Sequence, residues 1–464
     1  MDLIVVLAAL ALLMFAAYRG HSVIIMAPVA ALAAVLLTSP SSVAPMFSGT
    51  FMVAMVGFVK NYFPVFLLGA IFGKLIELSG FSKAIVAAVI RWIGADQAIL
   101  VIVVVCALLT YGGVSLFVAV FAVYPFAAEL FRQNNIPKRL IPGVIALGAF
   151  SFTMDALPGT PQIQNIIPTT FFGTTTWAAP ALGIVSSIFI LIVGILYLNW
   201  RRRVCVAKGE GYANGPLLNE PDAVDKDHLP NPILAITPLV LIGISNFILT
   251  RMIPVWYGTS NTVAMPGMKE PLVTSINSVV GIWAVQGALL IGIVFILITA
   301  WSTVSKKIAD GSKQAVSGAM LAGLNTASEY GFGAVIATLP GFLVVKEALV
   351  SIPNPLVNAA VSVSTLAGIT GSASGGMSIA LAALGEHFVQ SANAAGIPME
   401  VLHRIVAMAS GGMDTLPQNG AVITVLAVTG LTHKQSYPDI FAITLIKTAA
   451  VFFAITVYYT TGLV

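Results

Sequence analysis

Long apolar runs follow one another along almost the whole chain, and they constrain its fold more than any other feature. A helix needs about 20 apolar residues to cross a bilayer, whereas a membrane β-barrel shows shorter alternating segments. Of the 464 residues, 58% are apolar and only 9% are charged, against about 25% in soluble domains. The sequence therefore predicts an all-α polytopic protein of the lipid bilayer. It excludes a soluble enzyme, a nucleic-acid binder and a secreted scaffold.

The apolar runs predict the membrane spans and the segments between them. Residues 46–59 and 315–327 are expected to be interfacial or partly buried, and residues 81–92 to form an arm on the membrane surface. The expected spans are residues 3–18, 23–38, 62–78, 140–172 (interrupted), 178–199, 232–250, 275–301, 330–345, 401–430 (interrupted) and 440–464.

Two further apolar stretches, residues 98–131 and 358–390, are interrupted by glycine and serine near their middles. The interruptions read Tyr-Gly-Gly-Val-Ser at 111–115 and Gly-Ser-Ala-Ser-Gly-Gly-Met-Ser at 371–378. A bilayer tolerates backbone groups freed by a break only where they line a cavity or are buried in protein. Each stretch is therefore predicted to be a re-entrant hairpin that enters and leaves by the same face.

Three motifs occur twice along the chain, in the same order. The two copies are offset by 263 residues at the glycines and by 259 at the aspartates. Such self-similarity indicates two structural repeats. The pairs are Gly-Gly-Val-Ser at 112–115 with Gly-Gly-Met-Ser at 375–378, Ile-Pro at 136–137 with Ile-Pro at 397–398, and Met-Asp-Ala-Leu-Pro at 154–158 with Met-Asp-Thr-Leu-Pro at 413–417.

The number of crossings in each repeat predicts how the repeats are related. We count five spanning helices and one re-entrant hairpin per repeat, with broken helices at mid-membrane. Because five is odd, the second repeat starts on the opposite face, which is the inverted topology of many secondary transporters. We predict a first inverted repeat at residues 1–199, a polar cytoplasmic linker at 200–231 and a second inverted repeat at 232–464.

The basic residues predict the orientation, because cytoplasmic loops carry an excess of Lys and Arg. With the amino terminus outside, 16 of the 22 basic residues fall inside and five outside, while Lys447 lies within the last span. The chain is thus expected to be a multi-pass protein of the bacterial inner membrane with both termini outside. The outer residues are Lys60, Arg251, Lys269, Lys346 and Arg404. The inner residues are Arg19, Lys74, Lys83, Arg91, Arg132, Lys138, Arg139, Arg201, Arg202, Arg203, Lys208, Lys226, Lys306, Lys307, Lys313 and Lys434.

The two hairpin tips are candidates for binding an organic anion. Glycine lets an anion approach main-chain N–H groups, and helix N-termini supply partial positive charge without a cation. The alternative is that small residues only permit close helix packing. The candidate tip residues are Gly112, Gly113, Ser115, Ser372, Ser374, Gly375, Gly376 and Ser378.

The repeated Met-Asp-x-Leu-Pro motifs cannot continue a helix, because proline removes a backbone donor and clashes with the preceding turn. Each motif lies near the middle of a long apolar run, so unwound carbonyls there can bind an ion or substrate hydroxyls. Neutral polar side chains around the breaks are further candidates for substrate binding: Thr153, Thr160, Thr415, Gln418 and Asn419.

Asp155 and Asp414 are the repeat-related carboxylates within these breaks. An ionisable residue inside a membrane is costly and usually functional, so both are candidates for proton coupling. The alternative, left open, is that each caps the half-helix that follows its break. Glu329, Glu386 and His387 are weaker candidates, expected at helix ends near water.

Other chemistries lack their signatures. The sequence shows no metal-ligand spacing, no nucleophile–base arrangement and no phosphate-binding motif for ATP hydrolysis. No cofactor or metal is therefore predicted, and the protein is not expected to be an enzyme. Because almost no Lys or Arg falls in the expected site, a small monocarboxylate with hydroxyl groups is favoured over a tricarboxylate or a phosphate.

Several segments together resemble the gluconate permease family of the ion transporter superfamily. They are the Gly-Gly-Val-Ser tip, Asn-Ile-Pro-Lys-Arg at 135–139, the run at 152–161 and the run at 409–422. The resemblance implies proton-coupled uptake of gluconate or a similar hydroxy or keto acid, such as 3-hydroxybutyrate. It also implies a homodimer and an elevator-type movement. Sodium-dependent relatives carry Ser-Asn-Thr at both tips, whereas Gly-Val-Ser and Gly-Met-Ser here favour protons.

The sequence therefore predicts a secondary transporter that takes up a small organic anion together with protons. Two alternatives remain open. One is a cation/proton antiporter that uses the aspartates as ion ligands, and the other is a sodium-coupled symporter of di- or tricarboxylates.

Overall fold

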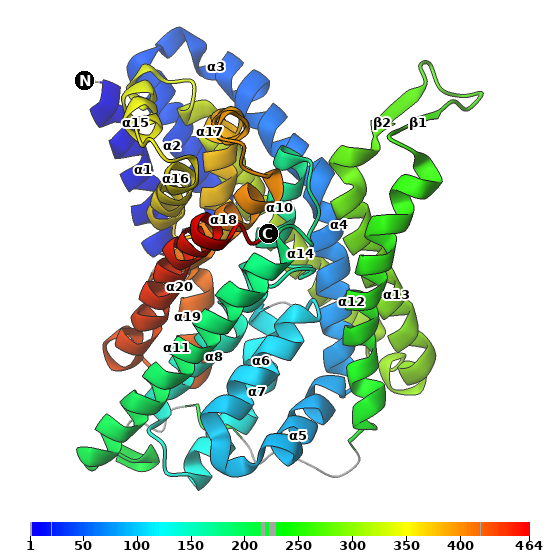
Figure 1. Cartoon of the computed structure of the whole chain (residues 1–464), viewed down its shortest axis with the longest axis vertical. Helices are drawn as coiled ribbons and strands as arrows, with labels where there is room; N and C mark the ends of the chain where they lie inside the picture. Colours follow the sequence, from blue (N-terminus) through cyan, green and yellow to red (C-terminus); the bar gives the residue numbers. More distant parts are fainter. Residues whose placement is uncertain (1, 20, 115, 215–218, 222–228, 418) are drawn as a thin grey trace.

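A computed structural model of the chain describes residues 2–19, 21–114, 116–214, 219–221, 229–417 and 419–464. This part of the chain is helical apart from turns, connecting segments and one antiparallel hairpin of two strands, β1 (Ser260–Val263) and β2 (Leu272–Ser275). Figure 1 shows that the hairpin projects beyond the ends of the two helices that it joins. The fold class expected from the apolar runs is confirmed at this level: the protein is an all-α polytopic membrane protein.

The helices of the first half extend to residue 214. They are α1 (Asp2–Tyr18), α2 (Val23–Thr38), η1 (Pro40–Ser42), α3 (Val43–Pro45), η2 (Met46–Phe51), α4 (Met52–Leu78), α5 (Phe81–Ile93), η3 (Ala95–Gln97), α6 (Ala98–Tyr111), α7 (Leu116–Gln133), η4 (Lys138–Leu140), α8 (Ile141–Ala149), α9 (Phe152–Asp155), α10 (Ile163–Phe172), α11 (Pro180–Ala207) and η5 (Tyr212–Asn214).

The helices of the second half follow a similar order. They are α12 (Pro232–Tyr257), α13 (Ile276–Val304), α14 (Ile308–Ile336), α15 (Pro340–Val350), α16 (Pro355–Thr370), α17 (Ala373–Ala394), α18 (Met399–Gly411), η6 (Gly412–Thr415), α19 (Gly420–Thr429) and α20 (His433–Thr461).

In the described residues, five helical segments are long and apolar enough to cross a membrane: Pro40–Leu78, α11, α12, α13 and α20. Two sharply bent pairs raise this number to seven if each pair is one span. They are α5 with Ala95–Tyr111, at 111°, and α14 with α15, at 95°. The arm expected at residues 81–92 is α5, the first member of one bent pair.

Three segments differ from the expectation. The pieces at 46–59 and 315–327, expected to be short and either interfacial or partly buried, are partly buried but belong to the long helical segments Pro40–Leu78 and α14. Glycines and polar residues interrupt the apolar pattern there but not the helix. The span expected at 330–345 is broken, since α14 ends at Ile336 and Pro340 starts α15 at a new angle. Proline is favoured in the first turn of a helix but not inside one.

The two expected hairpins form as α6 with α7 and α16 with α17, and in each the two helices pack against each other. The second turn lies earlier than the paired glycines suggested. Gly371 ends α16 in the left-handed region with φ of 67°, and the hydroxyl of Ser372 accepts from Gly375 N at 3.1 Å, which caps α17. Both are ordinary helix-end devices. Gly376 therefore lies inside α17, where a Cβ would approach Ala367 Cα to 2.1 Å.

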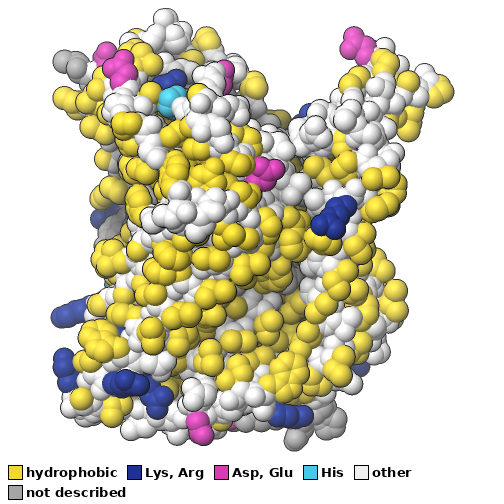
Figure 2. All heavy atoms as spheres, in the orientation of Figure 1, with side chains coloured by type: hydrophobic (Ala, Val, Ile, Leu, Met, Phe, Trp, Pro, Cys, Tyr) yellow, Lys and Arg dark blue, Asp and Glu magenta, His cyan; other side chains and the backbone are white. Residues whose placement is uncertain are grey.

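Two pairs of long helices pack along each other on different sides of the molecule. α4 packs along α14 and also contacts α13, while α11 packs against α20. Figure 1 shows α11 and α20 side by side on a diagonal, and they run in opposite directions, since Ala181 N at the start of α11 donates to Val464 O after the end of α20 at 3.2 Å. In Figure 2 hydrophobic side chains cover the middle of this face, and most Lys and Arg side chains gather towards the lower end, near α5 and the end of α11.

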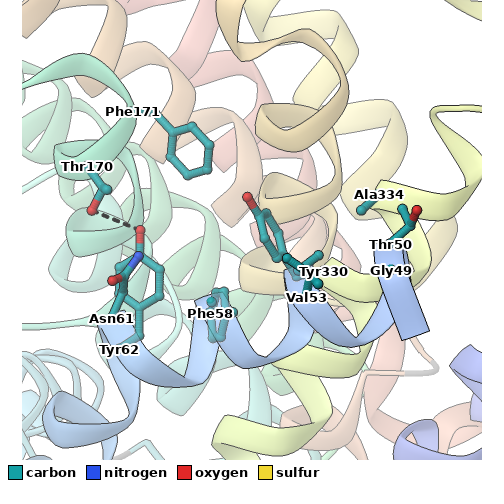
Figure 3. Close-up of a pocket in the computed structure, with 12 residues that line it drawn as sticks. Gly49, Thr50, Val53, Phe58, Asn61, Tyr62, Thr170, Phe171, Tyr330 and Ala334 are labelled. Atoms are coloured by element: carbon teal, nitrogen blue, oxygen red, sulfur yellow. Dashed lines mark hydrogen bonds between the residues drawn. The ribbon is translucent and has the colours of Figure 1, made fainter. Parts of the chain in front are cut away.

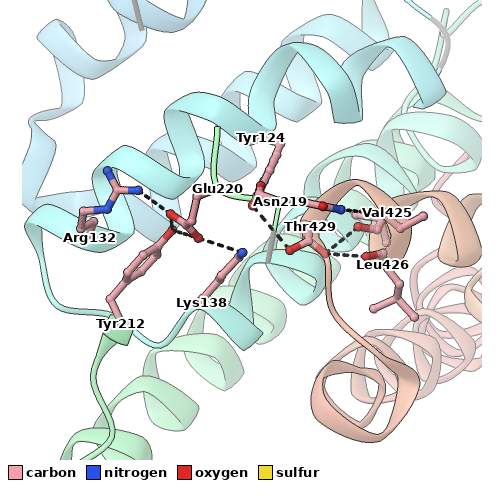
Figure 4. A network of polar contacts seen from close by, with 10 residues as sticks. Tyr124, Arg132, Lys138, Tyr212, Asn219, Glu220, Val425, Leu426 and Thr429 are labelled. Carbon is pink, nitrogen blue, oxygen red and sulfur yellow. Dashed lines mark hydrogen bonds and ion pairs between the residues drawn. The ribbon is translucent and has the colours of Figure 1, made fainter. Parts of the chain in front are cut away.

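The polar stretch between the halves contacts both of them (Figure 4). Tyr124 of α7 donates its hydroxyl hydrogen to Asn219 O at 2.8 Å, and Asn219 Nδ2 donates to Ala427 O of α19 at 2.8 Å. Glu220 forms ion pairs with Arg132 and with Lys138, the second at 2.8 Å. The connection therefore fastens the end of α7 to the end of α19.

Candidate transport site

The breaks in the two long apolar runs meet near the centre of the molecule. The carboxylate of Asp155, at the end of α9, lies against Gly411 at the end of α18. A Cβ at position 411 would lie only 1.6 Å from Asp155 Oδ2. The first break therefore contacts the second break three residues before Asp414, and glycine is required at the point of contact.

Lys447 of α20 supplies a positive charge to this centre. Its side chain is buried, and its ammonium group donates to Phe150 O, in the segment between α8 and α9. It also interacts electrostatically with both Asp155 and Asp414. One lysine thus lies close to a carboxylate from each half of the chain.

Arg404 of α18 is completely buried and braces the first break. Its Nη1 donates to Asp155 O at 2.7 Å and to Asn165 Oδ1 at 2.9 Å, and its Nη2 donates to Ala178 O at 2.7 Å. A planar guanidinium with five donors can satisfy several carbonyls that a broken helix leaves free. The second half of the chain therefore holds the unwound backbone of the first half.

His403 extends this brace. Its Nδ1 is 2.7 Å from Thr174 Oγ1, and its Nε2 is 3.2 Å from Asn165 Oδ1. Asn165 in turn donates to Thr160 O and Thr176 O at 3.0 and 2.9 Å. The loop between α10 and α11 is thus tied to the break through a small set of buried polar side chains.

These contacts correct two expectations. Arg404 was counted only as one of the outer basic residues, and it is instead completely buried at the site. The site was expected to contain almost no basic residue, and this is wrong, since Arg404 and Lys447 are buried beside the aspartates. The signal available in the sequence was a charge inside an apolar run, at 401–430 for Arg404 and at 440–464 for Lys447. Such a residue is rarely exposed to lipid.

The two aspartates have different surroundings. Asp414 Oδ1 accepts from Ala373 N at 3.3 Å and from Asn419 Nδ2 at 2.8 Å. Asp155 Oδ2 is buried and, among the described residues, has no hydrogen-bond partner. Neither carboxylate caps the half-helix after its own break, because Asn419 caps α19 and no side chain caps α10. The capping alternative fails in that form: Asp414 bonds the first turn of α17 instead.

The first hairpin tip is closed by its own hydrogen bonds and by apolar packing. The N–H groups of Gly112 and Gly113 donate to carbonyls of α6 at 2.9 and 3.0 Å, so neither points towards a ligand. A Cβ at Gly112 would come within 2.3 Å of Leu239 Cδ2. Gln162 Nε2 donates to Thr110 O at 2.7 Å, which ties the tip to the first break. The glycines of this tip therefore serve close packing in this structure.

The second tip is held by carboxylates and hydroxyls. Ser374 Oγ lies 3.3 Å from Thr326 Oγ1 of α14, and Asp414 accepts from the first N–H of α17. Glu329 of α14 lies so close to Gly375 that a Cβ there would be 1.7 Å from Glu329 Oε2. The hydroxyl of Ser378 is buried and, in the part of the chain that is described, unpartnered.

The other predicted residues are mostly bonded within the protein. Thr153 donates to Gly148 O at 2.9 Å, Thr160 to Thr153 O at 2.7 Å, and Thr415 Oγ1 lies 2.6 Å from Thr444 Oγ1. Ser115 and Gln418 lie outside the described residues. These threonines stabilise the breaks here, so a ligand would have to displace existing hydrogen bonds to reach them.

Glu329 was expected near water at a helix end, and this is wrong: it lies inside α14 and is 5% exposed. Glu386 is exposed, in agreement with the expectation, and His387 Nε2 is 3.2 Å from Ser391 Oγ. Sequence reasoning placed Glu329 at the start of a span because the preceding residues are polar, although they continue the same helix.

A cavity of about 610 Å³ lies between η2, α4, α10 and α14 (Figure 3). Aromatic side chains line it, and Tyr62 donates its hydroxyl hydrogen to Thr170 Oγ1 at 3.0 Å. Tyr330 lies directly after Glu329, so the cavity borders the helix that touches the second tip. The aromatic lining residues are Phe58, Tyr62, Phe171 and Tyr330.

Among the described residues, no group of three or more His, Cys, Asp or Glu side chains could hold a metal ion. The buried charges at the centre number two aspartates, one lysine and one arginine, with Glu329 beyond them. This arrangement can bind and release protons or a small charged solute.

Comparisons with known proteins fit a transporter. No family model matches the chain. The chain is 55% identical over 472 residues to the transporter YxjC of Bacillus subtilis (strain 168), covering 100% of both chains. Among solved structures it is similar to the YdaH transporter of Alcanivorax borkumensis, with TM-score 0.47, 14% identity and coverage of 89% of this chain and 88% of that chain.

It is also similar to MtrF of Neisseria gonorrhoeae, with TM-score 0.51, 12% identity and coverage of 87% of this chain and 82% of that chain. MtrF represents a class of antimetabolite efflux pumps. This likeness shows a shared fold alone. The protein is therefore a multi-pass membrane transporter and not an enzyme.

The comparisons contradict the expected resemblance to gluconate permeases, because the relative that matches over the whole chain is YxjC and the fold is similar to that of MtrF. The motifs that suggested it have a general physical origin. Proline and glycine occur wherever a membrane helix is broken or turned, so the motifs report the architecture rather than one family. The homodimer and the elevator-type movement, which only that resemblance implied, lose this support.

Proposed function

The chain belongs to the family of the Bacillus subtilis transporter YxjC, and from this premise we propose that it is a secondary transporter that takes up a small organic monocarboxylate together with protons. The proposed substrate is a hydroxy or keto acid, with 3-hydroxybutyrate as a representative. Transport proceeds by alternating access to a site between the two breaks and the two hairpins.

The observation that carries the proposal is the buried carboxylate of Asp155. Its Oδ2 is without a hydrogen-bond partner in the described residues, and its charged neighbours are Lys447, Arg404 and Asp414. Burying an ionisable group with an unsatisfied oxygen is costly and is retained mainly where it serves transport. A proton or a ligand donor would satisfy that oxygen, so Asp155 and Asp414 are proposed as proton-coupling groups.

The available charge favours a substrate with a single carboxylate. Arg404 is committed to carbonyls and to Asn165, and Lys447 already bonds Phe150 O. A di- or tricarboxylate would require further cations. Although two basic residues are buried at the site, both already bond protein groups, so a substrate with a single carboxylate is still favoured.

Two unpartnered hydroxyls favour a substrate that also carries oxygen atoms beyond its carboxylate. Within the described part of the chain, Thr110 Oγ1 on α6 and Ser378 Oγ on α17 are buried without partners. One comes from each hairpin, and a hydroxy or keto group supplies the complementary hydrogen bond. Thr110 was not among the residues predicted from the sequence.

The architecture is proposed to be two inverted repeats at residues 1–199 and 232–464, joined by a cytoplasmic linker at 200–231. The order of elements supports this, because hairpin, broken helix and long terminal helix occur once in each half. The basic residues gathered at the lower end of the molecule support a cytoplasmic position for that end, and Figure 1 places the N-terminus at the opposite end, in keeping with an outer position for it.

The test is uptake by purified protein in proteoliposomes with an inward proton gradient. Radiolabelled 3-hydroxybutyrate, lactate and pyruvate are the probes, and a protonophore is the control for coupling. We expect accumulation that the protonophore abolishes, that Asp155→Asn abolishes, and that Asp310→Asn, at an exposed position, leaves unchanged. Cation exchange without acid uptake would support an antiporter instead, and sodium-driven uptake of a dicarboxylate would support the other alternative.

A further inference from the structure

Glu329 is a third buried carboxylate near the centre, and its surroundings differ from those of the two aspartates. It lies on α14, one turn after Thr326, which contacts Ser374 at 3.3 Å. Its Oε2 lies against Gly375, in the first turn of α17, and its carboxylate interacts with Ser372. One helix therefore presents a hydroxyl and a carboxylate to the tip of the second hairpin.

No cation compensates Glu329 among the described residues. Its one charged neighbour is Asp414, which has the same sign. Of the elements packed against α14, α2 and η2 carry no titratable residue. The titratable residues of α4 and α17 interact with other groups or face outwards. On α4, Lys74 pairs with Glu77 at 2.8 Å and Tyr62 bonds Thr170. On α17, Glu386 is exposed. The remaining two are His387, which bonds Ser391, and Lys60, which is exposed.

The position of Glu329 is also where an anion would bind. The N–H groups of Ala373 and Gly375 are bonded to Asp414 and Ser372, so the attraction for negative charge here is that of the helix dipole, and α17 is 22 residues long. The glycine at 375 leaves room for a carboxylate at this point, since a side chain there would collide with Glu329. The unpartnered hydroxyl of Ser378 lies on the next turn of the same helix. The protein's own carboxylate thus occupies the place that the tip offers to a substrate carboxylate.

We infer that Glu329 is a further proton-binding group of the transporter, and that its carboxylate alternates with the substrate carboxylate at the first turn of α17. This inference rests on the proposed function. When Glu329 takes up a proton it loses its attraction for the helix end, and the substrate carboxylate binds there. When the proton leaves to the other side, the Glu329 carboxylate returns and displaces the substrate, so Glu329 carries one proton with each acid in addition to any proton carried by the aspartates.

The first half of the chain has no equivalent group. At the repeat offset of 264 that relates Gly69 to Gly333, position 329 corresponds to Val65. The first tip instead packs against Leu239 and other apolar side chains. The exchange of carboxylates is therefore confined to the second hairpin.

The test compares Glu329→Gln and Glu329→Asp with Glu386→Gln, an exposed position on α17, in proteoliposomes with 3-hydroxybutyrate. Two assays are run: accumulation driven by a proton gradient, and exchange of internal for external acid, which needs no net proton movement. We expect Glu329→Gln to keep exchange, with a weaker dependence on pH, and to accumulate much less acid than the unchanged protein. Glu329→Asp restores accumulation, and Glu386→Gln behaves like the unchanged protein.

Accumulation by Glu329→Gln equal to that of the unchanged protein would overturn the inference. Loss of both accumulation and exchange in Glu329→Gln and in Glu329→Asp would also overturn it, because it would indicate a structural role. A readout independent of transport is the infrared band of a protonated carboxyl group on titration, expected to be lost in Glu329→Gln. Failure of the unchanged protein to accumulate any acid would refute the proposed function, while the infrared band would still decide whether Glu329 binds a proton.

Discussion

The carboxylate of Asp155 rests on the backbone of Gly411, so the two broken helices touch where one residue lacks a side chain. A Cβ at position 411 would lie 1.6 Å from Asp155 Oδ2. Gly411→Ala must therefore displace the carboxylate from Lys447 or separate the breaks. We expect it to destabilise the protein by about 1–3 kcal/mol, the usual cost of an overpacked core, and to abolish uptake.

Gly420→Ala is the matched control, because a Cβ at the start of α19 meets nothing within 4 Å. The measurement is the thermal unfolding midpoint in detergent, with uptake recorded in parallel. In the double variant with Asp155→Ala the midpoint should recover while uptake stays lost. An unchanged midpoint for Gly411→Ala alone would show that the breaks do not pack as described.

Arg404 stabilises the first break through geometry as well as charge. Its guanidinium reaches Asp155 O, Asn165 Oδ1 and Ala178 O from one buried position. Lysine keeps the charge but lacks the planar arrangement of donors. Arg404→Lys leaves carbonyls unsatisfied, at about 1–3 kcal/mol for each buried group. We therefore expect a clear fall in the unfolding midpoint, and Arg251→Lys, at an exposed position, to leave it unchanged. Equal unfolding midpoints for the two variants would show that the hydrogen bonds of Arg404 do not stabilise the first break.

The sequence predicted where helices break but not what faces each break. Proline and glycine act on their own backbone, so the repeated motifs located both interruptions and both hairpins. Arg404 and Asp155 are 249 residues apart, and their contact depends on how the halves pack. From the sequence alone, Arg404 was therefore placed only among the outer basic residues, with no partner.

Glu329 illustrates the same limit. The sequence around it is polar enough to suggest a helix end, but a helix continues through polar residues when neighbouring helices cover them. The paired glycines at 375 and 376 were predicted to admit an anion, with close helix packing as the alternative. What approaches them, the carboxylate of Glu329 and the backbone of α16, depends on tertiary packing.

The aromatic cavity between α4, α10 and α14 offers a test of the path to the site. Gly57 lines it, and a Cβ there meets nothing within 4 Å, so a large side chain can enter without a backbone clash. We expect Gly57→Trp to fill part of the roughly 610 Å³ and to slow uptake strongly. The unfolding midpoint should stay the same.

Gly318→Trp is the control, since position 318 on α14 also has open space but does not line this cavity. The comparison of initial uptake rates for the two variants measures the effect. Equal rates would exclude the cavity from the path of the substrate.

Glu220 provides a pH-dependent link outside the membrane spans (Figure 4). Burial acts to raise the pKa of Glu220, but hydrogen bonds from Lys138, Arg132 and Tyr212 outweigh burial and hold its pKa below the usual range. The folded protein therefore binds this proton less tightly than the unfolded chain. The stabilisation is present above the ordinary pKa of a glutamate and is lost as the pH falls through the lowered value. Removing the charge by Glu220→Gln should cost about 1–3 kcal/mol at neutral pH.

Thermal unfolding of the unchanged protein and of Glu220→Gln, followed from neutral to acidic pH, measures this contribution. The difference between their midpoints should shrink on acidification, since a protonated Glu220 resembles glutamine in charge. Glu270→Gln, in the exposed loop between β1 and β2, should match the unchanged protein at every pH. Glu220 joins the end of α7 to the connection between the halves. If the difference between the two unfolding midpoints were the same at every pH, packing and not charge would hold this connection in place.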